Sequence, residues 1–486
     1  MSALPADFLE KLRRLLPQDG LLTAPEDLAP YECDALSAYR RRPPAVALPR
    51  TEEEISAVLN LCRMHGVPVV ARGHGTGLSG GALPIEDALL LSLARLNRIL
   101  SIDPLARTAR VQPGVRNLAI SQAAAPYGLY YAPDPSSQIA CSIGGNVAEN
   151  SGGLHCLKYG LTVHNLHEVR AITIDGDIIT LGSRAFDAPG YDLLALMTGS
   201  EGMLAVIVEI TVRLLPKPER AQVLLASFDS IANAGVAVGQ IIAAGIIPAG
   251  LEMMDKLAIQ AAEDYVHAGY PVGAEALLLV EVDGVNEEVS DGIRIVYEVV
   301  KACGATETRT ALDEAERTRF WAGRKAAFPA IGRISPDYYC MDGTIPRGRL
   351  PEVLVRISEL SEEYGLPVAN VFHAGDGNLH PLILYDANKP GELEKTEEMG
   401  GKILEACIAV GGTITGEHGV GVEKLNQMCV QFSSAELEVF HALKAAFDPP
   451  GLLNPGKAVP SLHRCAELGA MHVHHGQLSH PELPRF

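Results

Sequence analysis

The 486-residue sequence lacks the closely spaced cysteines that hold iron-sulfur clusters and zinc ribbons. Its nine cysteines are scattered, and no two of them lie within four residues of each other. We therefore expect reduced thiols in the core of a cytosolic protein. If this protein transfers electrons, it must use a bound organic cofactor.

Long apolar runs and an excess of positive charge are also missing. No hydrophobic stretch reaches the length that spans a membrane, and Asp7, Glu10 and Arg13 interrupt the apolar N-terminus, which excludes a signal-peptide core. The 40 Lys and Arg are outnumbered by 59 Asp and Glu, giving a formal net charge of -19. Broad contact with nucleic acid or anionic lipid is therefore disfavoured, and an acidic substrate needs local capture.

The sequence does contain enough apolar residues, at 47%, to form more than one hydrophobic core. Its strands, helices and turns predict an α+β chain with two lobes. We expect a helical N-terminal segment over residues 1–40, a first domain over 41–220 and a second domain over 221–415. A C-terminal segment, 416–486, is expected to return to the first domain. The proline-rich stretch 216–220 has the composition of a linker.

A glycine-rich loop over residues 72–81 follows a predicted buried strand at 67–71. Before that strand, Thr51 and Glu54 predict a capping box that opens an amphipathic helix. The stretch from Gly75 to Gly80 matches the G-x-G-x-x-G pattern, but a Rossmann loop must open a helix, whereas here a strand at 88–93 follows. One reading is a tight turn between two strands. Five glycines within nine residues favour the other, a cradle of backbone N–H groups for a pyrophosphate.

A second polar and glycine-rich stretch, over residues 133–153, is too long and too rich in donors for an ordinary turn. It suits a cofactor that lies along the backbone. Together, the two stretches predict one extended cofactor site in the first domain.

Two histidines, His373 and His380, flank a Gly-Asp-Gly turn, and the Glu417–His418 pair lies in a second glycine-rich segment. Two histidines and a carboxylate make a plausible site for Zn²⁺, Mn²⁺ or Fe²⁺ with a position open for substrate. Histidines at such a spacing are more often ordinary surface or core residues. The flanking glycines weaken that alternative, because they bring the backbone close to something at both places.

Several motifs carry a family resemblance: RGHGTGLSGGALP, DPSSQIACSIGGNVAENSGG, YGLTVHN, GSEGMLAVI and LLNPGKAVPSLHRCAE. From about residue 40 to the C-terminus, the sequence resembles the FAD-linked oxidases of the vanillyl-alcohol oxidase, or p-cresol methylhydroxylase, superfamily. Within it, the sequence is most similar to the glycolate oxidase D subunit and D-lactate dehydrogenase family. The resemblance implies a two-lobed fold, with a p-cresol methylhydroxylase-type FAD-binding domain and an antiparallel-sheet α+β substrate or cap domain.

The resemblance also implies which residues hold the FAD. These are Arg72, Gly73, His74, Gly75, Thr76, Gly77, Gly80, Pro133, Asp134, Ser142, Gly144, Gly145, Asn146, Gly152, Glu201, Gly202, Ile207 and Asn454. Some members of the superfamily attach FAD covalently through a histidine, and His74 lies in the loop. Because the closer family does not generally do so, we expect non-covalent FAD.

For the chemistry, the resemblance implies His373, His380 and Glu417 as metal ligands and His418 as the base. Arg324 would bind the substrate carboxylate and Asn378 would donate to the substrate, whereas Asp376 is interpreted as a turn residue. The alternative for Arg324 is a solvated pair with Lys325 on a helix surface. These roles fit the oxidation of a 2-hydroxy acid, which loses its hydroxyl proton to a base and its Cα hydrogen as hydride to the flavin.

The expected substrate is a small 2-hydroxy acid, glycolate or D-lactate. Phe328 and Cys340 occupy positions where relatives that act on 2-hydroxyglutarate carry polar residues, which favours a substrate without a second carboxylate. Three alternatives stay open: a D-2-hydroxyglutarate-type dehydrogenase, a non-catalytic FAD-binding subunit of an oxidase, and a metal-dependent hydrolase. The family precedent implies a second flavin subunit and an iron-sulfur subunit as partners. We expect a cytoplasmic protein that reaches the inner membrane only through those partners.

Overall fold

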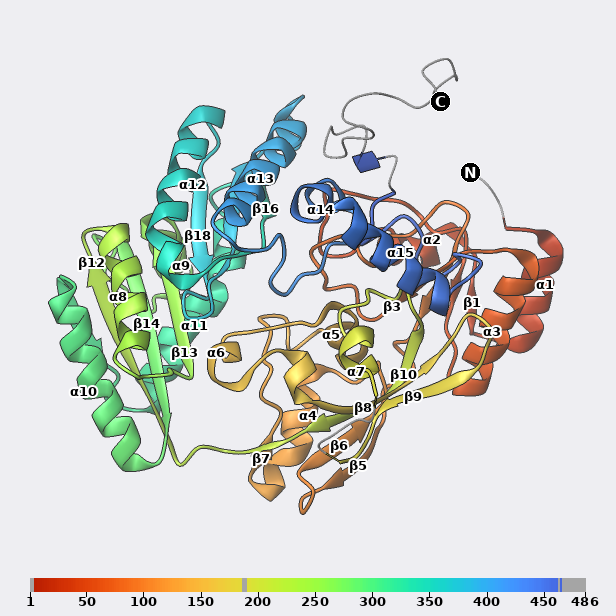
Figure 1. Cartoon of the computed structure of the whole chain (residues 1–486), viewed down its shortest axis with the longest axis horizontal. Coiled ribbons are helices and arrows are strands. Elements are labelled where there is room, and N and C mark those ends of the chain that lie inside the picture. Colours follow the sequence, from red (N-terminus) through yellow and green to blue (C-terminus); the bar gives the residue numbers. More distant parts are fainter. Residues whose placement is uncertain (1–3, 186–189, 462–463, 466–486) are drawn as a thin grey trace.

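Two groups of β-sheets, each covered by helices, form the two lobes of the molecule (Figure 1). The computed structural model describes residues 4–185, 190–461 and 464–465. One lobe contains strands β1 to β10, and the other is built on a seven-stranded sheet. Within the described residues, no helix has both the length and the apolar character needed to cross a membrane.

The first sheet places the glycine loop. Its strands follow the order β1 (Leu21–Leu22), β2 (Val46–Ala47), β4 (Leu89–Ser92) and β3 (Val69–Arg72). Strands β3 and β4 are parallel, and the described residues between them form the glycine loop without a helix. The structure therefore agrees with the non-Rossmann interpretation of the G-x-G-x-x-G match.

Helix α3 (Glu52–His65) packs beside this sheet together with α1 (Ala6–Leu15). The Thr51 side chain accepts a hydrogen bond from the Glu54 backbone N–H, as the predicted capping box requires. The reciprocal bond differs from the prediction, because the Glu54 carboxylate accepts from the Arg50 N–H, one residue earlier. Gly66, with a φ of 62°, ends the helix in the left-handed conformation.

A five-stranded antiparallel sheet completes the first lobe. Its strands follow the order β5 (Ile99–Asp103), β6 (Thr108–Val111), β10 (Val206–Arg213), β8 (Leu166–Ile172) and β9 (Ile178–Gly182). Strand β7 (Leu129–Tyr130) pairs separately with β11 (Leu215–Pro216). The short helices of this lobe are α2 (Pro25–Leu28), α4 (Asn117–Ala124), α5 (Ile143–Glu149), α6 (Cys156–Tyr159) and α7 (Leu193–Met197).

The second lobe is built on an antiparallel seven-stranded sheet. Its strands follow the order β15 (Glu307–Thr310), β12 (Arg220–Phe228), β14 (Ala276–Gly284), β13 (Gly250–Asp255), β18 (Val368–Phe372), β20 (Pro381–Tyr385) and β16 (Asp337–Cys340). A two-stranded ladder, β17 (Gly343–Thr344) with β19 (Asn378–Leu379), lies beside it.

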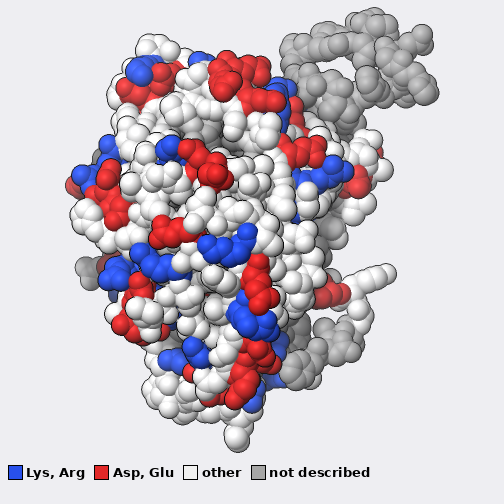
Figure 2. All heavy atoms as spheres, turned by 90° about the vertical axis from the view of Figure 1, so that its left-hand side faces the viewer, with Lys and Arg blue, Asp and Glu red and all other residues white. Residues whose placement is uncertain are grey.

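Helices cover both faces of this sheet, so its central strands are buried on both sides. Alternate residues along β14 point to opposite faces: Leu278 and Val280 belong to one apolar cluster, and Leu277 and Leu279 to the other. The first cluster includes side chains of α8 (Ile231–Ala243), α10 (Asn286–Ala302), α12 (Leu350–Tyr364) and α13 (Glu392–Ala409). The second includes side chains of α9 (Lys256–Val266) and α11 (Glu314–Ile331). On the outer face of this lobe, acidic and basic side chains are mixed (Figure 2).

The C-terminal segment returns to the first lobe through α14 (Leu425–Gln431) and α15 (Ser434–Phe447) (Figure 1). The Asn454 backbone N–H donates to the Val69 carbonyl at 2.8 Å, beside the glycine loop. A disulfide joins Cys429 to Cys465, which corrects the expectation that all cysteines are reduced. The other seven cysteines are free thiols. The expected C-terminal segment beyond Cys465 lies outside the described residues.

Candidate active site

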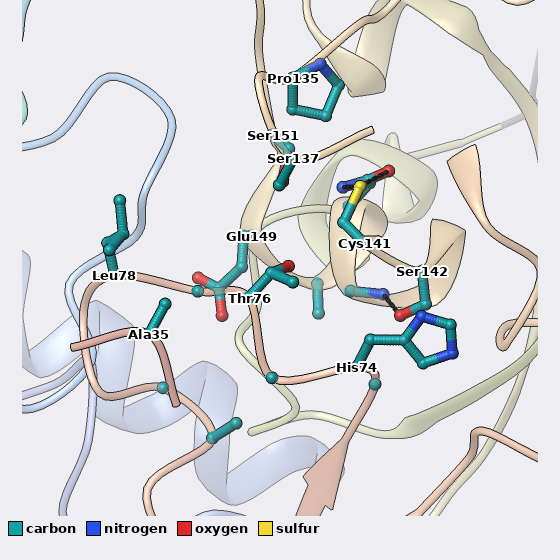
Figure 3. Close-up of a pocket in the computed structure, with 18 of the residues that line it drawn as sticks. Ala35, His74, Thr76, Leu78, Pro135, Ser137, Cys141, Ser142, Glu149 and Ser151 are labelled. Atoms are coloured by element: carbon teal, nitrogen blue, oxygen red, sulfur yellow. Dashed lines mark hydrogen bonds between the residues drawn. The ribbon is translucent and has the colours of Figure 1, made fainter. Parts of the chain in front are cut away.

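A single cavity of about 570 Å³ is lined by both glycine-rich stretches and by the histidine cluster of the second lobe. Figure 3 shows His74 beside Ser142 and Thr76 beside Glu149, where the two stretches meet along one wall. Thirteen of the residues predicted to hold FAD line this cavity: Arg72, Gly73, His74, Gly75, Thr76, Gly77, Ser142, Gly144, Gly145, Asn146, Glu201, Gly202 and Ile207.

Glycine leaves room for a neighbouring side chain at two of these positions. A Cβ atom on Gly73 would lie 2.2 Å from the Ser142 Oγ, and one on Gly75 would lie 2.1 Å from the Arg72 guanidinium. Gly75 also has a φ of +71°. At these positions the backbone itself forms the cavity wall, and the cavity has the size of a cofactor site. These residues fit FAD.

Five residues predicted to bind FAD are not among the described residues that line the cavity: Gly80, Pro133, Asp134, Gly152 and Asn454. The structure gives several of them supporting contacts. The Asp134 carboxylate accepts from the His155 N–H at 3.2 Å, and Asn454 Nδ2 donates to the carbonyls of Gly81 and Glu201. These contacts fix the backbone behind the cavity wall.

Gly80 and Gly152, which do not line the cavity, also lie close to neighbouring side chains. A Cβ on Gly80 would lie 2.5 Å from the Val422 Cγ2, and one on Gly152 would lie 2.5 Å from the Glu417 Oε2. Gly152 therefore makes room for a carboxylate of the histidine cluster. The carbonyl of Pro133 accepts from the Asn117 Nδ2 at 3.1 Å.

Sequence analysis missed several residues that line the cavity. They include Ala35, Leu93, Pro113 and Pro329, whereas Leu78, Ser137, Cys141 and Glu149 lie within the two glycine-rich stretches that were predicted to hold the cofactor. Ala35 arrives from the N-terminal segment through a backbone hydrogen bond from its N–H to the Gly77 carbonyl. Such a contact depends on the fold, and no local motif indicates it.

The predicted metal ligands converge on one point. His373 follows the end of β18, His380 precedes β20, and Glu417 comes from the C-terminal segment. The Glu417 Oε1 lies 3.3 Å from His373 Nε2 and 2.9 Å from His380 Nε2. The three ligand atoms lie within 4.8 Å of one another, which is the arrangement of a three-residue site for a divalent ion.

Each of these histidines engages its other ring nitrogen with the protein. His373 Nδ1 lies 2.7 Å from the Glu252 Oε1, and His380 Nδ1 lies 3.3 Å from the Met341 carbonyl. Metal-binding histidines are typically oriented in this way by a carboxylate or a carbonyl. The donor set therefore fits a divalent metal, with both Nε2 atoms turned toward Glu417.

The charges of the cluster perturb its acids and bases. Burial alone would lower the pKa of His373, but the carboxylates of Glu252 and Glu417 raise it well above its usual value. Burial would raise the pKa of Glu417, whereas hydrogen bonds from His373 and His380 hold it well below the ordinary value. The cluster thus behaves as one tightly coupled group of charges.

His418 lies directly against the cluster. Its ring stacks on His380 with a centroid distance of 4.8 Å, and its Nε2 lies 4.0 Å from the Glu417 Oε1. Its buried Nδ1 has no hydrogen-bond partner in the described part of the chain. Burial, together with the charge of His380, lowers the pKa of His418 to about 4 against the opposing effect of Asp342, so the imidazole is neutral at neutral pH.

Asp342, which sequence analysis did not identify, fixes the segment that carries Glu417 and His418. Its carboxylate accepts from the backbone N–H groups of Gly416, Glu417 and His418 and from the Lys424 ammonium at 3.1 Å. Both Asp342 and Lys424 are fully buried. Burial would raise the pKa of Asp342, but Lys424 and the nearby histidines lower it, so the carboxylate is ionised.

Arg324 extends from α11 into the cavity and is fully buried, which rules out the solvated pair with Lys325. Its Nε donates to the Glu252 Oε2 at 2.8 Å, and its Nη2 lies 2.7 Å from the same oxygen. Its buried Nη1 has no hydrogen-bond partner among the described residues. One carboxylate, Glu252, therefore orients both Arg324 and the metal-type histidine His373.

Asn378 differs from the expectation of a substrate contact. It is buried but is not among the described residues that line the cavity, and a Cβ on Gly416 would lie 2.5 Å from its side chain. Asp376 accepts from the Asn378 N–H at 3.0 Å, as a turn residue does. Phe328 lines the cavity with its ring 6.4 Å from that of His380, and the buried Cys340 thiol lies within 4.8 Å of His380 and His418.

A glycine-lined cavity beside a buried cluster of histidines, carboxylates and an arginine fits a flavin-dependent oxidoreductase. Two family models match the chain: the FAD binding domain over residues 43–182 and the C-terminal domain of FAD linked oxidases over residues 217–458. The chain belongs to the FAD-linked oxidase family. It is therefore an FAD-dependent enzyme, as its sequence motifs predicted.

Relatives of this family are similar over nearly the whole chain. Glycolate oxidase subunit GlcD of Escherichia coli strain K12 is 67% identical over 98% of this chain and 96% of its own length. GlcD of Bacillus subtilis is 42% identical over 88% and 91% of the two chains, and a D-lactate dehydrogenase of Anaerostipes hadrus is 32% identical over 93% and 97%.

The solved structure of p-cresol methylhydroxylase with substrate bound has the same fold. It matches with a TM-score of 0.81 over 95% of this chain and 98% of its own, at 18% sequence identity. The predicted two-lobed α+β oxidase fold is confirmed.

Proposed function

We propose that this enzyme oxidises a small 2-hydroxy acid, glycolate to glyoxylate or D-lactate to pyruvate. The observation that carries the proposal is that Arg324, His418 and the His373 cluster open into the cavity of the glycine loop. The relative that is 67% identical is named a glycolate oxidase subunit, whereas the named D-lactate dehydrogenase is 32% identical, which favours glycolate.

Two groups that the chain would bind supply part of the chemistry. FAD, held non-covalently by the cavity wall, supplies the acceptor for the hydride that leaves Cα. A divalent ion held by His373, His380 and Glu417, as Zn²⁺, Mn²⁺ or Fe²⁺, would supply a Lewis acid that lowers the pKa of the substrate hydroxyl. The remaining tasks, orientation of the acid and removal of its proton, fall to the protein.

Arg324 binds and orients the substrate carboxylate. Its Nη1 is buried beside the cavity and has no partner among the described residues, so a carboxylate there gains a charge-assisted hydrogen bond. Glu252 holds the other edge of the guanidinium and prevents its rotation. The carboxylate is thereby fixed at one end of the site, with the hydroxyl directed toward the histidine cluster.

His418 accepts the hydroxyl proton at its Nε2, the ring nitrogen that faces the metal-type ligands. A neutral imidazole in hydrogen-bond reach of the hydroxyl is the general base that this step requires. The hydrogen bond from the His418 backbone N–H to Asp342 keeps this base in place through turnover.

The size of the substrate is limited by Phe328 and Cys340. The aromatic ring of Phe328 lines the cavity next to His380, and Cys340 is buried beside the same histidine. Neither side chain could pair with a second carboxylate. These two side chains therefore favour a small acid and make a D-2-hydroxyglutarate-type activity the weaker, second candidate.

The electrons leave on a separate carrier, since the cysteines of this chain are scattered or paired in a disulfide. The relatives named GlcD are called subunits. We extend the proposal to a complex with a second flavin subunit and an iron-sulfur subunit, located in the cytoplasm and in contact with the inner membrane only through those partners. An FAD-binding subunit without chemistry would not require the buried cluster around Glu252.

An anaerobic absorbance spectrum of the purified chain tests the proposal. The flavin bands should bleach on addition of glycolate or D-lactate, and prior treatment with a chelator should prevent the bleaching. Yellow protein that neither acid reduces would support the non-catalytic subunit. Bleaching by D-2-hydroxyglutarate alone would identify the larger acid as the substrate. Bleaching that persists after complete removal of metal would overturn the proposed role of the divalent ion.

A further inference from the structure

Helix α11 presents a continuous surface to the cavity. Arg324, Lys325, Phe328 and Pro329 all line it, and they differ in exposure. Arg324 is fully buried, Phe328 is partly buried and Lys325 is exposed. The helix therefore forms one wall of a path from solvent at Lys325 to the buried guanidinium of Arg324.

Three permanent cations line the cavity: Arg72, Arg324 and Lys325. The Arg72 side chain donates to the Ala82 carbonyl, and Arg324 pairs with Glu252 at 2.7 Å. Lys325 makes no hydrogen bond and no ion pair with any residue that the structure describes. Of these three cations, Lys325 is thus the one whose side chain has neither a hydrogen bond nor an ion pair within the described chain, and it is also the exposed one.

The charge distribution of the molecule indicates a role for the ammonium group of Lys325. The formal net charge of -19 repels a small carboxylate at long range, and the surface of the second lobe in Figure 2 mixes both signs. Deeper in the cavity, Arg324 and Glu252 already neutralise each other as a pair. An incoming anion therefore meets a net attractive side chain at Lys325 before it reaches Arg324.

We infer that Lys325 captures the carboxylate of the substrate at the entrance of the cavity and delivers it to Arg324. The inference rests on the proposed function for the nature of the substrate, but it concerns binding and entry alone. Lys325 is a positioning residue: it guides the acid toward Arg324, and the proposed contacts with the acid during the reaction are those of Arg324 and His418. A rim charge of this kind changes the association rate and its dependence on salt more than the chemical step.

The test compares Lys325→Gln with Lys301→Gln in the FAD-loaded protein. Lys301 is exposed near the end of α10 and has no ion pair in the described structure, so its substitution changes the net charge equally, away from the cavity. At low ionic strength, Lys325→Gln should lower kcat/KM for glycolate by about fivefold with kcat unchanged. The difference from the wild type should vanish in about 1 M salt, where the Debye length is about 3 Å. Lys325→Arg should restore the wild-type value.

A second readout does not require turnover. Oxalate, a dianion that cannot be oxidised by hydride loss, is titrated into the holoenzyme while the flavin spectrum is recorded. Its Kd should rise in Lys325→Gln, with the same salt dependence, and stay unchanged in Lys301→Gln.

The outcomes separate this inference from the proposed function. Equal kinetics and equal oxalate affinity in the two glutamine variants, in protein that oxidises glycolate, would overturn the role of Lys325 and leave the proposed function intact. Salt-dependent loss of oxalate affinity in protein that oxidises neither acid would support Lys325 while the proposed function fails. A loss confined to dicarboxylic hydroxy acids would overturn capture at the entrance, because Lys325 would then bind the second carboxylate.

Discussion

In the first lobe, glycines bring backbone atoms to the cavity wall, whereas the second lobe contributes buried ionisable side chains such as Arg324, His373 and His380. Gly73 and Gly75 bring main-chain atoms to the cavity surface within a few residues of one strand. Glu252, Arg324 and His373 come from β13, α11 and the end of β18 and meet only in the folded chain.

This difference implies that binding of the cofactor and oxidation of the substrate can be disrupted separately. Substitutions in the charged cluster should leave FAD in place and abolish its reduction. Substitutions in the glycine loop should release FAD from a charged cluster that is otherwise intact.

The largest effect is expected for His418→Asn, which removes the proposed base and retains a polar side chain. The rate of flavin reduction by glycolate should fall by about 10² to 10⁴-fold, the usual contribution of a general base. Stopped-flow absorbance measures this rate, and the ratio of flavin to protein absorbance should equal that of the wild type.

His441→Asn is the matched control, because His441 is partly buried and bonds to the Pro460 carbonyl, away from the cavity. Loss of FAD from His418→Asn, with FAD retained in His441→Asn, would contradict the expectation that substrate oxidation can be disrupted without loss of the cofactor.

Glu252→Gln should have the next largest effect. The amide retains the shape but loses the charge that orients His373 and Arg324 together. Loss of a carboxylate behind a metal ligand typically lowers metal affinity or activity by about 10- to 100-fold. Metal content after dialysis and kcat/KM for glycolate measure the two consequences.

Asp255→Asn provides the control on the same strand. Asp255 is also buried, accepts from the Ala258 N–H at 3.0 Å as the cap of α9, and bonds to Asn370. Asp255→Asn keeps an acceptor for the cap but loses the charged oxygen that accepts from the backbone and side chain of Asn370, so it should cost about 1 kcal/mol of stability without a change in metal content. Equal metal loss in both variants would show that Glu252 acts through general stability.

Gly73→Ala should weaken FAD binding by about tenfold, since a Cβ that lies 2.2 Å from the Ser142 Oγ forces a shift that costs on the order of 1 to 3 kcal/mol. The Kd of FAD is measured by fluorescence on the apoprotein. Gly239→Ala, in α8, is the control, because its Cβ meets no described atom within 4 Å. Once Gly73→Ala is saturated with FAD, glycolate should reduce its flavin at the wild-type rate, and a slower rate would show that the glycine loop and the charged cluster are coupled.

The sequence allowed prediction of features that depend on neighbouring residues. The strand after the glycine loop, in place of a helix, could be read from residues 82–93 and excluded a Rossmann fold. Most of the residues predicted along the cofactor wall line the cavity, because a motif that approaches a ligand through its backbone is continuous in sequence.

The rest depends on contacts between distant segments. Glu252 reaches His373 because β13 pairs with β18 in a register that places Met253 opposite Phe372. No local pattern sets that register. Glu252 lies between the apolar residues Leu251 and Met253 of the buried strand Gly250–Asp255, and a carboxylate at such a position is the local signal that could have indicated a functional residue. Asp342 and the disulfide of Cys429 with Cys465 are likewise fixed by tertiary structure.

The smallest expected effect belongs to Thr51→Ala, which removes the side-chain acceptor at the start of α3. The loss should be about 1 kcal/mol of local stability, or about fivefold less protection of the Glu54 amide from hydrogen exchange. Thr51→Ser retains the acceptor and should behave as the wild type. Helix α3 packs beside β3, the strand that enters the glycine loop, so the FAD affinity of Thr51→Ala shows how far the backbone wall depends on its support. An unchanged Kd means that the loop is held by its own contacts with Ser142 and Arg72. A higher Kd for FAD, without a change in the rate of flavin reduction, would show that the glycine loop depends on helix α3 for support. The charged cluster would still be independent of that support.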